Sequence, residues 1–346
     1  MGSHKKLFSF FCHFLFLLLS GMQVEARFQH YHPTKLFVFG DSYVDTGNTR
    51  IAVSSSWKQP YGMTFPKRPA GRWSDGRVLS DYISKYLGLK SPVPYSLRKL
   101  MPQHLKQGMN FAFGGTGVFD TSFPFPNMTT QIDFLEQLIK DKVYTTSDIS
   151  NSVAYISVAG NDYNHYLSTN GSIQGFPSFI ASVVNQINTN LISIKKLGLK
   201  KIVVGGLEPL GCLPQITASS SFQQCNSTFN DLTVLHNKLL NKVVTKLNQE
   251  SKGHTTYLIL DLHDSVMSVL NHPSTHNIKN PLKPCCVGVS TEYSCGSVDL
   301  NNVKKYRVCD KPNSAFFWDM LHPTQAGWHA VYNKLQTKSV LRQLLK

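Results

Sequence analysis

Short, largely apolar runs alternate along this chain with longer segments in which apolar residues recur every three or four positions. The run 36–39 is continuously apolar, and 109–113, 153–158, 202–204 and 257–260 are the further strand-like runs. Runs of this length without polar alternation are typical of strands that are buried on both faces of a parallel sheet. The pattern therefore predicts an α/β fold in which helices cover both faces of a central parallel sheet.

The clearest helical pattern lies between the third and the fourth of these runs. Its apolar face comprises Phe176, Phe179, Ile180, Val183, Val184, Ile187, Leu191 and Ile194. Lys195, Lys196 and Gly198 supply the basic residues and the glycine that commonly end a helix. Further helices are predicted over about 229–247 and over 325–345. The segments 54–76 and 273–312 are irregular, and loops of that length are uncommon unless they are functional, so each is expected to wall a cleft.

The first 26 residues have the pattern of a secretory signal. Lys5 and Lys6 precede an apolar run over 7–19, and Val24-Glu25-Ala26 suits a cleavage site. The run is too short for a comfortable membrane span, and no later stretch is long enough either. We therefore expect one domain over 27–346, secreted to the extracellular space or the cell wall, without stable membrane insertion. A signal anchor that stays attached is the alternative.

The cysteines agree with secretion. Cys12 lies in the predicted signal, and the six that follow are Cys212, Cys225, Cys285, Cys286, Cys295 and Cys309. An even number in an oxidising compartment predicts up to three disulfides, with fifteen possible pairings. A zinc site is less favoured, because no C-x-x-C pair occurs, and we expect neither a metal nor a cofactor. Acceptor triplets for N-glycosylation begin at Asn127, Asn170 and Asn226.

The charge balance is basic, with 35 Lys and Arg against 20 Asp and Glu and a net charge of +15. The basic residues are scattered, whereas a nucleic-acid-binding protein concentrates them along one element, so we expect no nucleic-acid partner. Association with an acidic cell-wall polymer or an anionic membrane surface is one interpretation. A solvated surface without any partner explains the charge equally well.

Four short motifs carry candidate chemistry, and the first holds a serine. Ser42 in Gly40-Asp41-Ser42 directly follows a predicted strand, at the edge of the sheet where ligands of open α/β folds bind. Taken alone, this serine is better explained as a helix cap. Asp319 and His322 change that interpretation, because a histidine activates a serine nucleophile and a carboxylate orients the histidine. A local Asp–His hydrogen bond in a loop is the alternative for that pair.

The other two motifs supply candidate donors for an oxyanion. Asn161 in Gly160-Asn161-Asp162 follows a predicted strand and carries amide hydrogens, although this triplet is also good turn chemistry. The glycine-rich motif 114–117 also follows a strand, and glycine lets a ligand approach the backbone closely. A phosphate-binding loop is the weaker interpretation of the glycines, because neither the lysine nor the spacing of known phosphate motifs accompanies them.

These motifs make the chain resemble the plant-type GDSL esterase/lipases of the SGNH hydrolase superfamily, from Leu36 to about Tyr332. The resemblance rests on the segments 37–42, 44–48, 110–112, 159–162 and 317–324, and also on 71–77, 211–214 and 285–286. It implies a flavodoxin-like three-layer α/β/α sandwich without a cofactor. Tyr43 stands where the family's name motif has leucine, and Trp73 and Asp75 replace the usual Phe and Asn. These departures bear on substrate preference.

The resemblance also implies roles for individual residues. The nucleophile corresponds to Ser42, the acid to Asp319 and the base to His322, while the oxyanion donors correspond to the Ser42 backbone, Asn161 and one glycine. We assign the glycine as Gly115, with Gly114 and Gly117 as alternatives.

The implied function is hydrolysis of a lipid or small-molecule ester through an acyl-enzyme. The alternatives are acyl transfer through the same intermediate and an inactive binding protein. The aromatic residues Trp57, Phe65, Trp73 and 123–125 suggest an apolar cleft, although buried packing is the commoner use of such residues.

Overall fold

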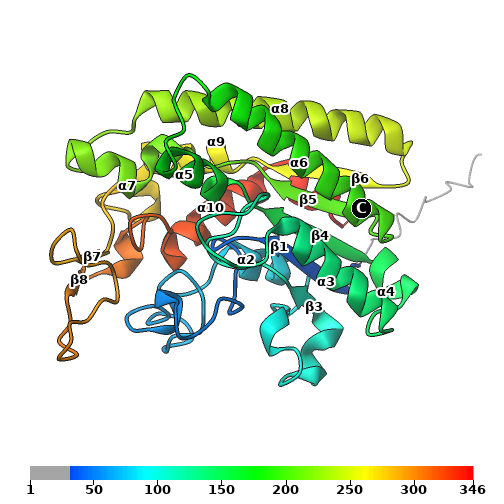
Figure 1. The fold of residues 1–346 in the computed structure, drawn as a ribbon, viewed down its shortest axis with the longest axis horizontal. Coiled ribbons are helices and arrows are strands. Elements are labelled where there is room, and N and C mark those ends of the chain that lie inside the picture. Colours follow the sequence, from blue (N-terminus) through cyan, green and yellow to red (C-terminus); the bar gives the residue numbers. More distant parts are fainter. Residues whose placement is uncertain (1–31, 346) are drawn as a thin grey trace, which may run out of the picture. The chain divides into compact units, whose positions relative to one another are not determined.

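A six-stranded parallel sheet forms the centre of the fold in the computed structural model, which describes residues 32–345 (Figure 1). The predicted secretory signal lies outside the described residues. The strands are β1 (Lys35–Gly40), β2 (Val93–Pro94), β3 (Gly108–Asn110), β4 (Ser152–Ser157), β5 (Lys201–Gly205) and β6 (Thr256–Leu260). All pairings between them are parallel, as the short apolar runs predicted.

The strand order is β2-β3-β1-β4-β5-β6. Apart from the two-residue edge strand β2, this is the order of a flavodoxin-like sheet, so the predicted fold is confirmed. The chain extends the sheet from β1 first towards β3 and then towards β4 on the other side. The carboxyl ends of β1 and β4 therefore flank the point where the winding reverses, which is where ligands bind in open α/β sheets.

Helices pack in two groups that form the outer layers. The first group is α3 (Met128–Lys140), α6 (Phe176–Lys196) and α8 (Ser227–Ser251), and Figure 1 shows α6 and α8 side by side. The second group is α2 (Leu79–Tyr86), α9 (Leu262–Asn271) and α10 (Gln325–Thr337), which pack on one another through α10. Each group buries an apolar face, as the helical spacing of apolar residues predicted for α6.

Shorter helices connect these elements. They are α4 (Thr146–Ser150), α5 (Gly160–Ser168), α7 (Pro214–Thr217) and α11 (Ser339–Gln343). The helix expected over 325–345 is two helices, because Lys338 has extended backbone angles and its ammonium group binds the Asp261 carboxylate at 2.5 Å. The helix expected from about 229 starts earlier, because the Asn226 side chain caps α8 by accepting from the Phe229 N–H.

The strand expected over 109–113 is shorter in the structure. Phe111 and Phe113 still donate their N–H groups to the carbonyls of β1, at Val38 and Gly40. The N–H of Ala112 is instead taken by the Asn110 side chain, so regular pairing ends at Asn110. Polar side chains that bond the backbone locally compete in this way with a sheet ladder.

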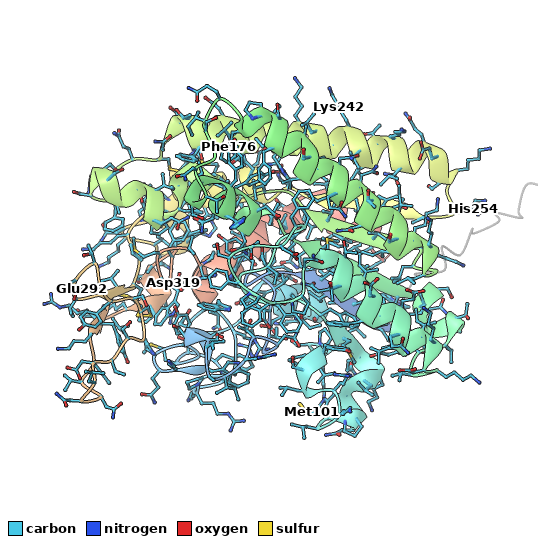
Figure 2. The ribbon with its side chains drawn as sticks, viewed as in Figure 1. Met101, Phe176, Lys242, His254, Glu292 and Asp319 are labelled. Carbon is cyan, nitrogen blue, oxygen red and sulfur yellow. A yellow bond between two sulfur atoms is a disulfide. The ribbon has the colours of Figure 1, made fainter. Side chains whose placement is uncertain are left out.

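Three disulfides resolve the fifteen possible pairings: Cys212–Cys225, Cys285–Cys309 and Cys286–Cys295. Two of them close the irregular segment 273–312, whose only regular pairing is a two-stranded ribbon of β7 (Cys286–Gly288) and β8 (Tyr306–Val308). In Figure 2, Glu292 of this segment lies at the edge of the molecule and Asp319 lies further inside.

Among residues 32–345, no helix is long and apolar enough to cross a membrane.

Candidate active site

Ser42 lies in a tight turn at the carboxyl end of β1. Gly40 is required there, because its φ is 140° and a Cβ at this position would lie 1.9 Å from the carbonyl oxygen of Ser157. Asp41 then closes the turn by accepting a hydrogen bond from the Tyr43 N–H at 3.0 Å. The turn is thus fastened between β1 and β4, and it presents the Ser42 hydroxyl at the crevice of the sheet.

His322 joins Ser42 to Asp319 in one continuous hydrogen-bonded chain. The Nε2 atom of His322 lies 2.8 Å from Oγ of Ser42, and its Nδ1 atom lies 2.9 Å from both carboxylate oxygens of Asp319. The three side chains come from opposite ends of the sequence and are all buried. The sequence-predicted serine, base and acid are therefore brought together at hydrogen-bonding distance.

The local turn that carries the pair holds Asp319 in place. Its Oδ1 atom accepts the backbone N–H groups of Leu321 and His322 at 2.9 and 2.8 Å. Burial acts to raise the pKa of Asp319, but the adjacent His322 and these hydrogen bonds outweigh it, so the pKa lies below its usual value. Asp319 is therefore an ionised carboxylate at neutral pH, which favours a proton on Nδ1 of His322 and leaves Nε2 able to accept one.

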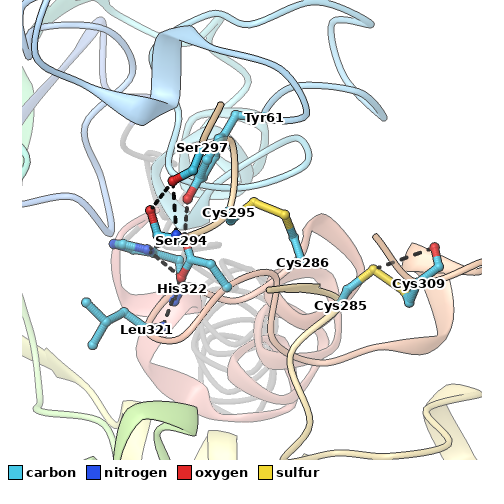
Figure 3. Close-up of a disulfide and its surroundings, with 10 residues drawn as sticks. Tyr61, Cys285, Cys286, Ser294, Cys295, Ser297, Cys309, Leu321 and His322 are labelled. Carbon is cyan, nitrogen blue, oxygen red and sulfur yellow. Dashed lines mark hydrogen bonds and ion pairs between the residues drawn. A yellow bond between two sulfur atoms is a disulfide. The ribbon is translucent and has the colours of Figure 1, made fainter. Parts of the chain in front are cut away.

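Two aromatic residues of segment 54–76 contact His322 and Asp319 and hold them in place. The Trp73 ring stacks on His322 with 5.2 Å between ring centroids, and Tyr61 donates its hydroxyl hydrogen to Oδ2 of Asp319 at 2.7 Å. Figure 3 shows Tyr61 close to the Cys286–Cys295 disulfide, with which it shares a buried cluster. Nothing in the sequence around Tyr61 marks it as a partner of Asp319.

The candidate glycine donors for the oxyanion differ in whether the backbone N–H already donates a hydrogen bond. Gly114 donates to Oδ2 of Asp45 at 3.0 Å and to Oγ1 of Thr49 at 2.8 Å, so its N–H is already used. Gly117 is buried, and a Cβ there would lie 2.4 Å from the Asp162 carboxylate. Gly115 is partly exposed, and within residues 32–345 its N–H donates no hydrogen bond, which is also true of the Ser42 N–H.

Asn161 connects the glycine loop to the serine. It lies in the first turn of helix α5, and its amide Nδ2 donates one hydrogen to the Thr116 carbonyl at 3.0 Å, which leaves the second hydrogen available. The next residue, Asp162, accepts the N–H groups of Val118 and Phe119 at 3.0 Å each. Gly160-Asn161-Asp162 therefore fixes the position of the whole glycine loop, in addition to offering an amide donor.

Asp45 and Gln131 hold the surrounding backbone. Asp45 accepts bonds from four backbone N–H groups, which belong to Gly47, Asn48, Thr49 and Gly114. Gln131, fully buried on α3, both accepts from the Gly40 N–H and donates to the Gly40 carbonyl, at 2.8 and 2.9 Å. The sequence signal for Gln131, which was not among the predicted site residues, is a polar residue within the buried face of a helix.

A cavity of about 200 Å³ opens beside Ser42 and is also lined by Asn161 and His322. Most of its wall is apolar and comes from segments that follow β4 and β5: Val158, Leu167, Phe176, Leu207, Leu210, Leu213, Ile216 and Phe229. The aromatic residues that the sequence suggested for this wall are elsewhere. Trp73 supports His322, while Trp57, Phe65 and 123–125 do not line the cavity. Gly115 does not line it either, but the next residue, Thr116, accepts a hydrogen bond from Asn161, which does.

The predicted glycosylation acceptors lie at the surface to different degrees. Asn170 and Asn226 are exposed. Asn127 is partly buried, and its amide already donates to Oδ1 of Asp120 at 2.8 Å.

Within residues 32–345, no cluster of three His, Cys, Asp or Glu side chains is arranged to hold a metal ion.

The fold and the site define an α/β protein with a serine, a histidine and a carboxylate linked at the crevice of its sheet. Over residues 36–335 the chain matches the family described as GDSL-like Lipase/Acylhydrolase, and it belongs to that family. It is 52% identical to GDSL esterase/lipase At5g03610 of Arabidopsis thaliana, over 97% of this chain and 98% of that one. It is 48% identical to GDSL esterase/lipase At3g09930 of the same plant, over 90% of both chains.

Among solved structures, a lipase from a goat rumen metagenome matches with a TM-score of 0.41 and 11% identity, over 88% of this chain and 96% of that one. Family membership and the identity to the two plant proteins make this chain a hydrolase that acts on ester bonds.

Proposed function

We propose that the protein is a secreted serine esterase or lipase that works through an acyl-enzyme on Ser42. The observation that carries the proposal is the hydrogen-bonded chain from Oγ of Ser42 through His322 to Asp319. A serine hydroxyl is a weak nucleophile unless a base within hydrogen-bonding reach takes its proton. His322 is at 2.8 Å, and its other nitrogen faces a carboxylate, which is the arrangement such a base requires.

In the first step, Oγ of Ser42 attacks the carbonyl carbon of the ester while Nε2 of His322 takes the hydroxyl proton. Asp319 stabilises the imidazolium that forms. When the tetrahedral intermediate collapses, the bond to the alcohol oxygen breaks, and His322 gives the proton to the departing alcohol. The acyl group remains on Ser42.

In the second step, water replaces the alcohol. His322 takes a proton from the water as its oxygen attacks the acyl carbon, and the released proton returns to Oγ of Ser42 as the carboxylic acid leaves. In both steps the negative oxygen is stabilised by the N–H groups of Ser42 and Gly115 and by the amide of Asn161. The unused N–H groups of Ser42 and Gly115 and the second amide hydrogen of Asn161 support this assignment.

Secretion is part of the proposal. The signal pattern of residues 1–26 and the three disulfides of the described chain support it, because disulfides persist in oxidising compartments. Asn170 and Asn226 are the acceptors we expect to carry glycans, since both are exposed. The net charge of +15 supports retention on an acidic cell-wall polymer.

The experiment that tests the catalytic proposal is labelling with a fluorophosphonate, followed by mapping of the modified peptide by mass spectrometry. We expect one adduct, on Ser42, and no adduct in the His322→Ala variant. Circular dichroism and a non-reducing gel establish that each sample is folded with its disulfides intact. A folded wild-type protein that takes up no label, or takes it up elsewhere, contradicts the proposal.

A further inference from the structure

Glu208 is an acidic side chain of the cavity that neither the sequence motifs nor the proposed reaction uses. It lies three residues beyond the end of β5 and lines the same cavity as Ser42 and His322. A Cβ built on Gly160 would lie 3.8 Å from Oε1 of Glu208, which places the carboxyl group against the start of helix α5. The carboxyl group therefore stands beside the residue that precedes Asn161, inside the wall that a bound ester would touch.

The charges that line the cavity are of one sign. Asp41 and Glu208 contribute carboxyl groups, and among the described lining residues there is no Lys or Arg, although the whole chain carries a net charge of +15. Asp41 is committed to the turn at Ser42 through the Tyr43 N–H. Glu208 interacts with the Tyr43 side chain, and it is the carboxyl group of the lining that the turn at Ser42 does not use.

Burial raises the pKa of Glu208, while hydrogen bonds with its own backbone and with the Tyr43 side chain, and the charge of His322, act in the opposite direction. Other titratable groups that interact with Glu208 are those of Asp41 and Tyr155. A partly desolvated carboxyl group keeps its charge at a cost in free energy, and a hydrogen-bond donor or a cation on a ligand offsets that cost. A second negative charge in the same space increases it.

The size and the polarity of the cavity limit what can enter. Its volume of about 200 Å³ is below the roughly 300–1,000 Å³ of sites that enclose a whole drug-sized ligand. It therefore has room for one arm of an ester, the acyl or the alcohol part. The apolar part of the wall favours a hydrocarbon arm, and Glu208 adds a carboxyl group to the neutral polar side chains of Ser157, Asn164 and Gln215.

We propose that Glu208 is a specificity-determining residue of this esterase, which excludes esters with an anionic arm and favours an apolar arm that bears a hydroxyl or an ammonium group. This inference rests on the proposed function, because it assumes that the ester reacts at Ser42. It deepens that function by naming the substrate class: short to medium esters that are uncharged or cationic. Esters with a free carboxylate on the bound arm are poor substrates.

The test uses two matched series of esters, because either arm can occupy the cavity. In the first series the acyl arm of 4-nitrophenyl hexanoate carries hydrogen, hydroxyl, ammonium or carboxylate at its end. In the second, the alcohol arm of butyl acetate is varied in the same way. The kcat/KM of each ester is measured at pH 8 for the wild type, Glu208→Gln and Glu136→Gln. Glu136 is exposed on α3 and paired with Lys140, so its variant controls for the loss of one negative charge.

In at least one series, we expect the kcat/KM of the wild type to be about 10- to 100-fold lower for the carboxylate ester than for the unsubstituted ester. Glu208→Gln should reduce this ratio of kcat/KM values, unsubstituted over carboxylate, about tenfold. It should also reduce any ratio by which the ammonium ester is preferred over the unsubstituted one, whereas Glu136→Gln should change neither of these two ratios. Wild-type enzyme that accepts the carboxylate esters as readily as the unsubstituted ones in both series overturns the inference, even if Glu208→Gln does not fold.

The fluorophosphonate label separates this inference from the proposed function. Glu208→Gln that is labelled on Ser42 but keeps the wild-type ratios in both series shows that Glu208 does not determine specificity, while the serine mechanism stands. A wild-type protein that hydrolyses these esters without being labelled on Ser42 refutes the mechanism, and the inference fails with it.

Discussion

The hydroxyl of Tyr61 donates a hydrogen bond of 2.7 Å to Oδ2 of Asp319, and this bond ties a loop near the start of the chain to the acid near its end. Oδ1 of Asp319 is held by its own turn, through the N–H groups of Leu321 and His322. Tyr61 is therefore the one hydrogen-bond partner of Asp319, among the described residues, that comes from outside that turn. Tyr61 is not among the residues that line the cavity, so we expect it to orient the carboxylate rather than to bind the ester.

Replacing this tyrosine tests whether the bond positions the acid. Tyr61→Phe keeps the ring in its buried cluster and removes only the hydroxyl. We expect kcat to fall about tenfold with KM nearly unchanged, because a hydrogen bond to a charged group is worth about 1.5–3 kcal/mol and part of it is recovered by rearrangement. The measurement is steady-state hydrolysis of a 4-nitrophenyl ester across the pH range.

Tyr86→Phe on helix α2 is the matched control, because Tyr86 lies outside the cavity and the triad. It should leave kcat and the pH profile unchanged. A Tyr61→Phe enzyme with wild-type kcat at every pH would show that the turn alone positions Asp319.

Asn161→Ala tests the amide donor. The variant removes the free amide hydrogen and the bond to the Thr116 carbonyl, so it affects both the oxyanion and the loop that carries Gly115. Removing one oxyanion donor typically costs about 10²–10³-fold in kcat, and we expect a loss in that range. Ser42→Ala should lose nearly all activity. Asn161→Asp is the informative companion, since its carboxylate keeps the size but repels the oxyanion, and it should be less active than Asn161→Ala.

The parts of the site that the sequence predicted are those written in contiguous residues. Asp319 and His322 are three positions apart and share one turn, and Ser42 directly follows an apolar strand, so local spacing predicted their placement. The structure brings them together, while their roles remain predictions for the experiments above. The alternation of apolar runs and helical patterns predicted a parallel sheet covered on both faces, whereas the flavodoxin-like fold was implied by the family resemblance.

The parts that the sequence did not predict depend on contacts between distant segments. Tyr61 meets Asp319 only because segment 54–76 packs against the disulfide-linked segment, and no spacing reveals that contact. The disulfide pairing is of the same kind, since it depends on which cysteines the folded chain brings within bonding distance. Glu208 follows β5 as Asn161 follows β4, but a lone glutamate before a proline carries no recognisable signal.

Removal of the Cys286–Cys295 disulfide tests how far the irregular segment supports catalysis. Cys286 also donates its N–H to the Trp318 carbonyl at 2.6 Å, so this bridge lies one residue from Asp319 and in the cluster that holds Tyr61. For the Cys286→Ser/Cys295→Ser variant we expect a loss of about 2–3 kcal/mol in the free energy of unfolding and a fall in kcat similar to that of Tyr61→Phe. Urea denaturation and steady-state kinetics measure the two effects.

The Cys212→Ser/Cys225→Ser variant is the control, because its bridge closes a loop of comparable length. The loss of stability should be similar, but Cys212 lies beside Leu210 and Leu213 of the cavity wall, so the change should be in KM rather than kcat. Equal effects of the two variants on kcat would show that the Cys286–Cys295 bridge has no special connection to Asp319.

His236 makes the stability of the fold depend on pH. It is fully buried on α8, where Nδ1 lies 2.6 Å from the Tyr163 hydroxyl, and burial lowers its pKa from 6.5 to about 3. The unfolded chain binds a proton at this residue between these two pH values and the folded chain does not, so acid favours unfolding there. The contribution of His236 is fully present above pH 6.5, and it falls by about 2 kcal/mol between pH 8 and pH 5.

A variant without the imidazole lacks this part of the pH dependence. His236→Gln removes the titrating group and keeps a polar side chain near Tyr163. Its free energy of unfolding, measured in urea at pH 8 and pH 5, should change with pH by about 2 kcal/mol less than that of the wild type, whatever its absolute stability. His254→Gln is the control, since this exposed residue lies beyond the C-terminal end of α8 and far from Tyr163 in the sequence, and its variant should keep the pH dependence that is due to His236. If His236→Gln and wild type lose the same free energy between the two pH values, His236 is protonated in the folded protein and does not oppose folding in acid.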